Sequence, residues 1–537
     1  MTVLPKAREV DMDKVQEILD RARKGAISEE ECELLKTLAE SYLTMTEAVR
    51  SKQVSMGRLR GMLFGNKSEK ADQVLGDKHA AAQDGTPRDK KAVDDREKPK
   101  GHGRNGVKEY TGAETVTCPH GTLKSGDECP ECKKGKVYPL PDPGLMIRVT
   151  GQSPLAATIY ELEKLRCNLC SKVFTAASPG GIGDAKYDER SASMLALLKY
   201  GSGLPFYRLQ GLQGALGIPL PTSTQWDIVK ELAASLEPVF AELIRQAAQG
   251  EVLHNDDTTM KILDYMGKRK EKSQESLEGT QRVGTFTSGI VSTGEAQKIA
   301  LFFTGQKHAG ENLQDVLKAR ADELDPPIQM CDALSRNTSP DFKAIVANCL
   351  VHGRRKFVEV AGNFPKETRH VLETLGEVYK NDAHTKKSRM TPEQRQRFHW
   401  EKSEPLMTAL RKWMRKKIDE REVEPNGGLG QAIAYMDNHW DQLTLFLTVP
   451  GAPLDNNICE AVLKRAILHR KNSLFYRSQR GARVGDLFMS LISTCQLSKT
   501  NPFDYLTALQ KHAEDVRRDP QEWMPWSYPQ ACAASET

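Results

Sequence analysis

Residues 252–263 read Val-Leu-His-Asn-Asp-Asp-Thr-Thr-Met-Lys-Ile-Leu, a β-type run that carries Asp256 near its middle. Two more β-type runs follow, at Val283–Ser292 and Lys298–Thr304. Gly-rich or charged segments separate the three runs, as expected for connections between neighbouring strands. The pattern therefore predicts three consecutive strands.

The period of the apolar residues then changes. A helical run at Glu311–Ala321 is followed by a fourth apolar strand, Ile328–Cys331, which ends at Asp332. After a further helix, Cys349–His352 is predicted to be a strand, and another helix is predicted from Arg354 onward. Three consecutive strands followed by alternating helices and strands predict a mixed α/β sheet with a ribonuclease-H-like strand order.

Two aspartates are expected to meet in this sheet. Asp256 lies within the first strand and Asp332 at the carboxyl end of the fourth, and these strands are neighbours in the predicted order. Like charges at close range repel, so the pair requires a positive group between the carboxylates. Mg²⁺ binds carboxylates together with water and phosphate oxygens, and two such ions can hold both reacting oxygens of a phosphodiester. The pair therefore predicts a site for Mg²⁺ or Mn²⁺.

A third carboxylate is expected on a helix near the strand ends. Residues 454–460 read Leu-Asp-Asn-Asn-Ile-Cys-Glu and offer Glu460, with Asp455 as the predicted N-cap of the helix. A simpler interpretation makes Glu460 a solvated residue that pairs with Lys464, four positions later. Composition and spacing leave both interpretations open.

A basic segment follows Glu460. Between Ala461 and Arg483 there are seven basic residues and no acidic one, and Phe475 and Tyr476 lie among them. Such a segment can neutralise phosphates, and its aromatic rings can stack on exposed bases. The residues from which we predict nucleic-acid contacts are Lys464, Arg465, Arg470, Lys471, Arg477, Arg480 and Arg483.

Residues 204–230 have the pattern of two helices joined by a short turn. A helical run at Leu204–Leu216 is followed by the turn Gly217–Pro221 and by a predicted capped helix that starts with Thr222. This order is compatible with a helix-turn-helix that binds DNA. Any other helical hairpin has the same pattern, so DNA contact at this position is one of two open interpretations.

Two cysteine pairs predict a zinc-binding module. Cys129 and Cys132 form one Cys-x-x-Cys pair, and Cys167 and Cys170 form another. Two such pairs can present four thiolates to Zn²⁺, and the ion would replace a core that so few apolar residues cannot build. The upstream Cys118 and His120 are either bystanders or further ligands. The alternative is a set of reduced cysteines packed in a core.

The N-terminal part has the pattern of a helical arm followed by a linker. Apolar residues from Leu35 to Leu63 recur at alternating spacings of three and four, with Lys52 in the one polar position. They predict a coiled coil of about four heptads, or alternatively a helix packed on its own domain. Residues 66–112 are rich in Lys, Asp, Gly and Pro, which predicts a disordered linker.

The composition excludes some classes of protein. The chain has 537 residues, enough for three or four domains, and 77 Lys+Arg against 72 Asp+Glu give a net charge of only +5. No apolar stretch is long enough for a membrane helix, and the N-terminus lacks the pattern of a secretory signal. Eleven cysteines are too dilute for a disulfide scaffold. We therefore expect a soluble cytoplasmic protein without a membrane partner.

The sequence contains an ordered set of motifs. The C-terminal motifs are Asp455–Glu460, Arg470–Phe475, Ser478, Arg480, Gly481, Thr494 and Asn501–Leu506. The upstream motifs are Leu63–Lys70, Gly101–Arg104, the cysteine segment, Lys199, Tyr200, Leu204–Arg208, His254–Thr258, Cys331, Asp332 and His352–Phe357. With these motifs the chain resembles the transposases of the insertion sequence 66 family over most of its length.

The resemblance implies a function and a catalytic site. Asp256, Asp332 and Glu460 would be the Asp-Asp-Glu metal ligands of a DNA transposase. A metal-activated water would cut one strand at the element end, and the freed 3′-hydroxyl would attack target DNA. The zinc module, the helix-turn-helix and the basic segment would bind the terminal repeats. The heptad helix would bring two ends together in a homo-oligomer, and accessory proteins from the same element are expected partners.

The sequence departs from the family pattern at two places. Asp257 stands where the family usually has glutamate, so it is a rival or auxiliary metal ligand. Gly121 stands where a second cysteine is expected after Cys118, so the zinc partners of Cys167 and Cys170 stay open. The Cys349-x-x-His352 spacing suggests metal binding, but we prefer strand packing with a phosphate or carboxylate contact from His352.

The prediction is therefore a multidomain α+β protein. Another class of function stays open, a catalytically silent zinc-containing DNA-binding protein or repressor derived from a transposase. The predicted parts are a helical arm (1–70), a charged linker (71–112), a zinc module (113–180), a helical DNA-binding region (181–249), the first part of the core (250–360), a helical insertion (361–450), the C-terminal core helices (451–515) and a tail (516–537).

Overall fold

The chain divides into two compact units, which are described separately. One unit comprises residues 81–156, and the other comprises residues 1–80 and 157–537. The predicted heptad helix and the predicted linker at 71–112 lie outside the described residues, so both stay predictions. A computed structural model describes residues 28, 115–118, 121–140, 146–149, 152–166, 168, 172–180, 183, 185–266, 284–294, 297–338 and 343–535.

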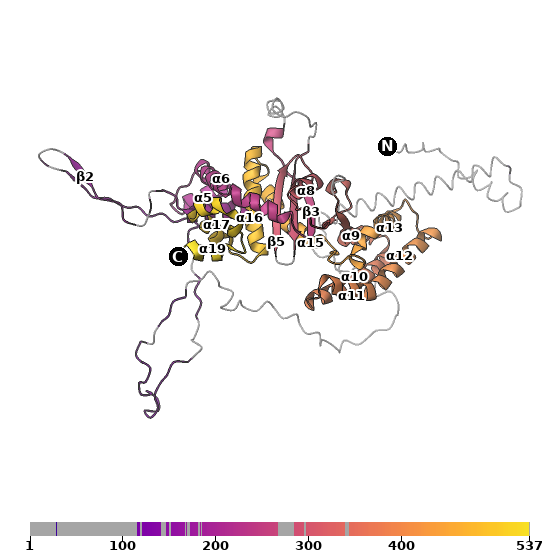
Figure 1. Cartoon of the computed structure of the whole chain (residues 1–537), viewed down its shortest axis with the longest axis horizontal. Helices are drawn as coiled ribbons and strands as arrows, with labels where there is room; N and C mark the ends of the chain where they lie inside the picture. Colours follow the sequence, from indigo (N-terminus) through magenta and orange to yellow (C-terminus); the bar gives the residue numbers. More distant parts are fainter. Residues whose placement is uncertain are drawn as a thin grey trace, which may run out of the picture. The chain divides into compact units, whose positions relative to one another are not determined.

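The larger unit is built on a five-stranded mixed sheet (Figure 1). The strands are β3 (Val252–Thr259), β4 (Phe286–Thr293), β5 (Lys298–Gly305), β6 (Ile328–Cys331) and β7 (Ile345–Asn348). They lie in the order β5-β4-β3-β6-β7. β3 pairs antiparallel with β4, and β4 with β5, whereas β6 and β7 add parallel to β3. The predicted mixed α/β architecture is confirmed.

The prediction of a strand at Cys349–His352 was wrong. The last strand, β7, ends at Asn348, and α9 (Leu350–Val360) begins after Cys349. β7 pairs with β6 along its whole length, so the pairing ends where β6 ends. The apolar run that follows continues into the first turn of a buried helix, and a run this short has no period that separates strand from helix.

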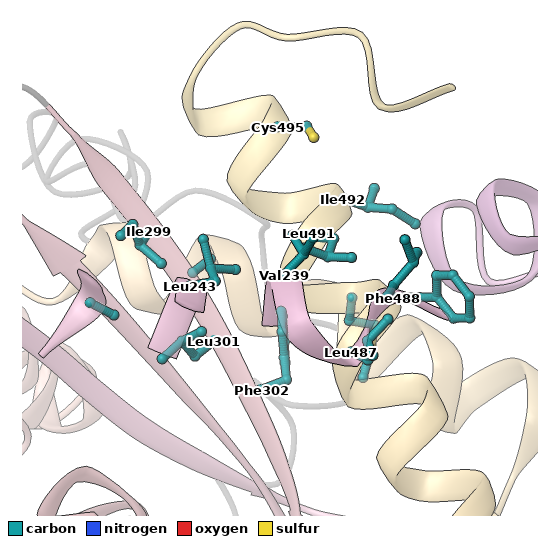
Figure 2. Packing of buried hydrophobic residues seen from close by; sticks show 14 of the residues in the cluster. Val239, Leu243, Ile299, Leu301, Phe302, Leu487, Phe488, Leu491, Ile492 and Cys495 are labelled. Carbon is teal, nitrogen blue, oxygen red and sulfur yellow. The ribbon is translucent and has the colours of Figure 1, made fainter. Parts of the chain in front are cut away.

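Helix α8 (Ala309–Leu317) connects β5 to β6, and α15 (Asn457–Ser473) packs across β3 and β4. A hydrophobic core joins β5, α6 (Thr222–Ala247) and α16 (Gln479–Leu497). Figure 2 shows side chains of this core: Ile299, Leu301 and Phe302 from β5, Val239 and Leu243 from α6, and Leu487, Phe488, Leu491, Ile492 and Cys495 from α16. α16 and α6 thus cover the β5 side of the sheet.

Helix α16 also provides hydrogen-bond acceptors for backbone N–H groups of the edge strand β5. Three of its side chains, spaced by four residues, accept hydrogen bonds from backbone N–H groups spaced by two residues on β5. Four helical residues rise about 6 Å and two strand residues about 6.6 Å, so the two spacings match. The backbone N–H groups on the outer edge of β5 therefore have hydrogen-bond partners along this stretch. The bonds run from the N–H of Thr304 to Asp486 Oδ2 (2.7 Å), of Phe302 to Ser490 Oγ (2.9 Å) and of Ala300 to Thr494 Oγ1 (3.1 Å).

A second hydrophobic core lies between strands β3, β6 and β7 and the helices that follow β7 in the chain and precede α15. Val252, Ile328 and Met330 of the sheet pack into this core. The helices predicted between Phe357 and Pro450 are observed. They are α9, α10 (Pro365–Lys387), α11 (Pro392–Lys402), α12 (Glu404–Asp419), α13 (Gly428–Asn438) and α14 (Trp440–Leu443).

The remaining elements of the larger unit are short or peripheral to the sheet. β1 (Lys164–Arg166) and β2 (Val173–Thr175) form an exposed antiparallel ribbon. Among the described ranges, no helix has the length and apolar character that crossing a membrane requires. The other helices are α4 (Glu189–Ala196), the π-helix η3 (Leu197–Gly201), α5 (Phe206–Ala215), α17 (Pro502–Lys511), α18 (Ala513–Arg518) and α19 (Tyr528–Ser535).

Candidate active site

The two predicted aspartates lie at equivalent positions of neighbouring parallel strands. β3 and β6 pair in a register that places His254 opposite Met330. Asp256 and Asp332 each follow these partners by two residues, so they continue the same register. The Asn337 amide joins the two carboxylates: its Nδ2 donates a hydrogen bond to Asp332 Oδ1 and lies 3.5 Å from Asp256 Oδ1. The sheet thus brings the two aspartates together.

Glu460 reaches the same region from the first turn of α15. The start of this helix is held on β3 by Asn456, whose Nδ2 donates to the carbonyl of Asn255 at 3.1 Å. Asn456 Oδ1 lies 3.1 Å from His254 Nδ1. The predicted N-cap was off by one residue, because Asn456 occupies that position. Asp455 still accepts a hydrogen bond from the N–H of Asn457 at 3.1 Å.

The pKa of Asp256 is raised by burial and by the negative charges around it. Burial raises the pKa of Asp256 to about 6, although the backbone N–H of Asp257 bonds its carboxylate and acts in the opposite direction. The negative charges of Asp332, Asp257 and Glu460 also raise this pKa. Such an effect requires proximity, since the Coulomb energy falls with distance. Asp332 and Glu460 are therefore near enough to Asp256 to influence its pKa, with Glu460 contributing least of the three charges. The carboxylate oxygens of Asp256, Asp332 and Glu460 do not all lie within 4.8 Å of one another.

A divalent cation fits this cluster. Glu460 Oε1 is buried and has no hydrogen-bond partner, which is costly for a carboxylate oxygen. Burial, together with the negative charges of its neighbours, disfavours the charged form of Asp256, as the raised pKa of this carboxyl shows. A bound cation would remove both penalties, and carboxylate oxygens are the ligands that Mg²⁺ and Mn²⁺ prefer. The residues that would hold it are Asp256, Asp332 and Glu460.

Asp257 is engaged elsewhere. Its side chain is only 2% exposed, and its Oδ2 lies 2.8 Å from His308 Nδ1. Its Oδ1 lies 3.4 Å from Arg336. Successive side chains of a strand point to opposite faces, which explains why Asp257 turns away from its neighbour Asp256. These contacts give Asp257 a partner set of its own, so we do not include it among the metal ligands.

The predicted basic segment separates into an exposed group and an internal group. Arg465 donates to the carbonyl of Gly201 at 2.9 Å, and Arg470 donates to the carbonyl of Thr259 at 2.6 Å. Both therefore tie α15 to other parts of the chain. The remaining five basic residues are exposed: Lys464, Lys471, Arg477, Arg480 and Arg483.

Of the two aromatic residues in the basic segment, one is free to stack on a base. Phe475 is 41% exposed. Tyr476 is buried, and its ring lies 4.6 Å from the His469 ring in a stacked arrangement. The segment that follows Glu460 therefore offers exposed cations together with the exposed ring of Phe475.

The predicted helix-turn-helix is present as two helices, α5 and α6, but its second helix differs from the prediction. Pro221 occupies the N-cap of α6 and no side chain caps this helix. The exposed side of α6 carries Asp227, Glu231 and Glu237. An acidic helix surface repels phosphates, which disfavours α6 as a recognition helix. The DNA contact predicted for this region stays a prediction.

One of the two predicted cysteine pairs lies in the described part of the smaller unit. Cys129 and Cys132 lie in a tight turn, where the N–H of Cys129 bonds the carbonyl of Gly135 at 2.8 Å and the N–H of Lys133 bonds that of Cys129 at 2.9 Å. Lys133 has a left-handed φ of 50°. Backbone N–H groups of Lys134 and Gly135 lower the pKa of Cys132. The turn therefore favours the thiolate form that a metal requires.

The rest of the predicted zinc ligand set is incomplete in the described chain. Cys118 is exposed. His120, Cys167 and Cys170 lie outside the described residues. The zinc module stays a prediction.

Two amides at the site were missed by sequence reasoning, Asn337 and Asn456. Asn337 lies in a short 3-10 segment after β6, and Asn456 precedes α15. Neither position has a periodic or spacing signal, because each amide acts through a loop that brings it to a distant strand. His352 was predicted to contact a carboxylate, and its Nε2 lies 3.9 Å from Glu460 Oε1.

The fold and the site define a mixed α/β protein in which Asp256 of β3, Asp332 directly after β6 and Glu460 of α15 are followed along the chain by exposed basic residues. The family model described as "Transposase IS66 family" matches residues 185–484, which is more than half of the chain and includes all three carboxylates. The chain therefore belongs to the IS66 transposase family.

Curated relatives come from Sinorhizobium fredii (strain NBRC 101917 / NGR234). The uncharacterized protein y4hP is 26% identical over 399 residues, covering 70% of this chain and 68% of the relative. The uncharacterized proteins y4jD and y4qI are 25% and 24% identical, each covering 63% of this chain and 66% and 62% of their own lengths. The chain thus spans about two thirds of the length of these relatives.

Proposed function

We propose that this protein is a DNA transposase that cuts one strand at the ends of its element and joins the freed 3′-hydroxyl to target DNA. The observation that supports the proposal is the placement of Asp256 and Asp332 around the Asn337 amide, with Glu460 near enough to contribute to the raised pKa of Asp256. Membership of the IS66 family supplies the reaction class. The strand order of the sheet supports a ribonuclease-H-like core for this reaction.

The protein's own residues would serve to position the reacting groups. Asp256, Asp332 and Glu460 would hold Mg²⁺ or Mn²⁺, which when bound lowers the pKa of a coordinated water and neutralises charge on a phosphodiester oxygen. Asn337 fixes the carboxylate of Asp332 by a hydrogen bond. Asn456 holds the start of α15, and hence Glu460, against β3. Rigid support of this kind keeps the carboxylates in place without reorganisation.

The exposed cations of the basic segment would bind the phosphates next to this site. They lie on α15, which carries Glu460, on α16 and in the loop between these helices, so DNA held by them would run past the carboxylates. The Zn²⁺ module, with Cys129 and Cys132 among its ligands, would add contacts to the terminal repeats. A homo-oligomer joined by the N-terminal arm, helped by accessory proteins of the same element, would hold two ends together.

Removing an exposed cation should weaken DNA binding in a salt-dependent way. We expect alanine at Arg477, Arg480 or Arg483 to reduce the slope of log affinity against log salt by about 1 each. Fluorescence anisotropy of labelled element-end DNA over a range of salt concentrations measures this slope. Lys511→Ala, on α17, is the matched control and should leave it unchanged. An unaltered slope in all three arginine variants would contradict the assignment of this surface.

Metal-dependent strand cleavage tests the proposed function directly. The substrate is DNA that carries the sequences flanking this gene, incubated with the full chain and Mg²⁺, Mn²⁺ or EDTA. We expect nicks that end in a 3′-hydroxyl with either ion and none with EDTA. Binding without cleavage under every metal condition would instead favour a catalytically silent DNA-binding protein or repressor.

A further inference from the structure

Three side chains with different metal-binding atoms meet beside the proposed catalytic cluster. The Cys349 thiol, the His352 imidazole and the Glu460 carboxylate each offer one ligand atom, and these atoms lie within 4.8 Å of one another. Cys349 is fully buried, whereas the side chains of His352 and Glu460 are 23% and 28% exposed. The trio is therefore reachable from solvent on one side only.

The backbone holds the trio in place. Cys349 N-caps α9, and His352 lies three residues later on the same side of the helix. The N–H of Cys349 bonds the carbonyl of Cys331 at 2.9 Å, which joins α9 to the end of β6. The Cys349 sulfur accepts the N–H of Asn456 at 3.3 Å, which joins it to the start of α15. Cys349 thus connects the start of α9, which carries His352, to the start of α15, which carries Glu460.

Two atoms of this trio lack partners. His352 Nδ1 and Glu460 Oε1 are both buried without a hydrogen bond. The distance of 3.9 Å between His352 Nε2 and Glu460 Oε1 is too long for a hydrogen bond between them. A buried polar atom without a partner is costly, and a metal ion bound by the trio would give Glu460 Oε1 a partner.

We propose that Cys349, His352 and Glu460 form a second metal site, which takes a thiophilic divalent ion of the Zn²⁺ class. A sulfur, nitrogen and oxygen donor set suits zinc and excludes Mg²⁺, which takes oxygen ligands. Ligand atoms around tetrahedral zinc lie roughly 3.3 to 3.8 Å apart, so the trio must close by about 1 Å at most. The fourth position is left to water, and the thiol proton is released to solvent on binding.

Because Glu460 belongs to both ligand sets, the second site would regulate the first. An ion of the Zn²⁺ class at the trio takes the carboxylate that Mg²⁺ needs, so it should inhibit strand cleavage. This regulatory part rests on the proposed function, whereas the binding part does not. The two parts are therefore tested separately.

Cobalt binding tests the site without any activity assay. Metal-free full-length protein is titrated with Co²⁺, and the thiolate-to-cobalt absorption band is recorded. We expect wild type to bind one Co²⁺ more than Cys349→Ser, with a weaker band in the variant that reports only the cysteines of the zinc module. Cys495→Ser, which alters another buried cysteine on α16, is the matched control and should bind like wild type.

A second variant guards against misfolding. His352→Gln should also lose the additional Co²⁺, while circular dichroism and thermal melting check that each variant folds. Equal stoichiometry and equal spectra for wild type, Cys349→Ser and His352→Gln would overturn the site.

The regulatory part is measured as the ratio of cleavage in Mg²⁺ with and without added Zn²⁺. We expect at least a tenfold loss for wild type and less than about a threefold loss for Cys349→Ser, in line with the loss of one of three protein ligands. Equal inhibition of both proteins would overturn the regulatory role. If no cleavage occurs under any condition, the proposed function fails, and the Co²⁺ result still decides whether the site exists.

Discussion

Asp332→Ala should lower the rate of strand cleavage at least about a thousandfold, equivalent to about 4 kcal/mol on the barrier, while DNA affinity changes less than about twofold. Asp332 sits level with Asp256 on the neighbouring strand and is fixed by Asn337, so its loss leaves the cluster without one of its three carboxylates. Asp332 is acidic and does not belong to the exposed cations that would carry DNA affinity. Cleavage and anisotropy assays on the same preparations measure both quantities.

A matched control is provided by the adjacent pair Asp256 and Asp257. Asp256→Asn should lose cleavage as completely as Asp332→Ala. Asp257→Asn makes the same chemical change one residue later, at a carboxylate that bonds His308 and faces Arg336. We expect it to cost about 1 to 3 kcal/mol of stability, as for a broken buried pair, and to reduce cleavage far less.

Two results would contradict the assignment of the carboxylates. One is wild-type cleavage by Asp332→Ala. The other is an Asp257→Asn protein that melts like wild type but is as inactive as Asp256→Asn.

The strands and the positions of the aspartates could be predicted because they follow from local patterns. Short apolar runs separated by charged or Gly-rich segments mark strands, and their order along the chain restricts the sheet to few topologies. Asp256 and Asp332 then fall on neighbouring strands without knowledge of any contact. Where the apolar run continued past a strand end, at Cys349, the same pattern gave a wrong element.

The partners of polar side chains could not be predicted from local patterns. Arg465 and Arg470 look like the other cations of the basic segment, yet they bond backbone carbonyls of distant segments. Asn337 and Asn456 join elements that only the fold brings together. The sequence gives the charge or amide group of each side chain, whereas its hydrogen-bond partner is determined by tertiary packing.

The same limit applies to the polar residues in the middle of α16. Asp486, Ser490 and Thr494 interrupt an apolar helix, and their spacing of four residues places them on one face. Nothing in the sequence states that this face meets the backbone of an edge strand. The contact is nevertheless important for stability, because it buries a carboxyl group completely against the Thr304 backbone.

Stability should fall as pH rises toward neutrality because of Asp486. Burial raises the pKa of this carboxyl to about 7, although two hydrogen bonds from Thr304 and the charge of Arg483 act in the opposite direction. In the unfolded chain the pKa returns to near 3.8. Between these values the folded state holds a proton that the unfolded state has lost, so the free energy of unfolding decreases with pH. The loss is at most about 4 kcal/mol and is complete above about pH 7.

Asp486→Asn should remove this dependence and stabilise the protein at about pH 8 by about 1 to 3 kcal/mol. The amide oxygen can accept the N–H of Thr304, and the amide nitrogen can donate to Thr304 Oγ1. The Thr304 hydroxyl then turns to Thr287 Oγ1, which already lies 2.8 Å away. Every bond is kept while the buried charge is lost, which is the condition under which replacing a buried ion stabilises a protein.

Denaturant midpoints of wild type and Asp486→Asn between about pH 4.5 and 8 measure the difference, which should grow with pH and level off above about 7. Asp227→Asn is the matched control, since it makes the same change on the exposed face of α6, and its difference from wild type should stay small at every pH. An Asp486→Asn protein that is less stable than wild type at about pH 8 would mean that the ionised carboxylate is the better partner for the Thr304 backbone. Burial would then not be the dominant influence on this group, and the α16 contact with β5 would depend on a charged hydrogen bond.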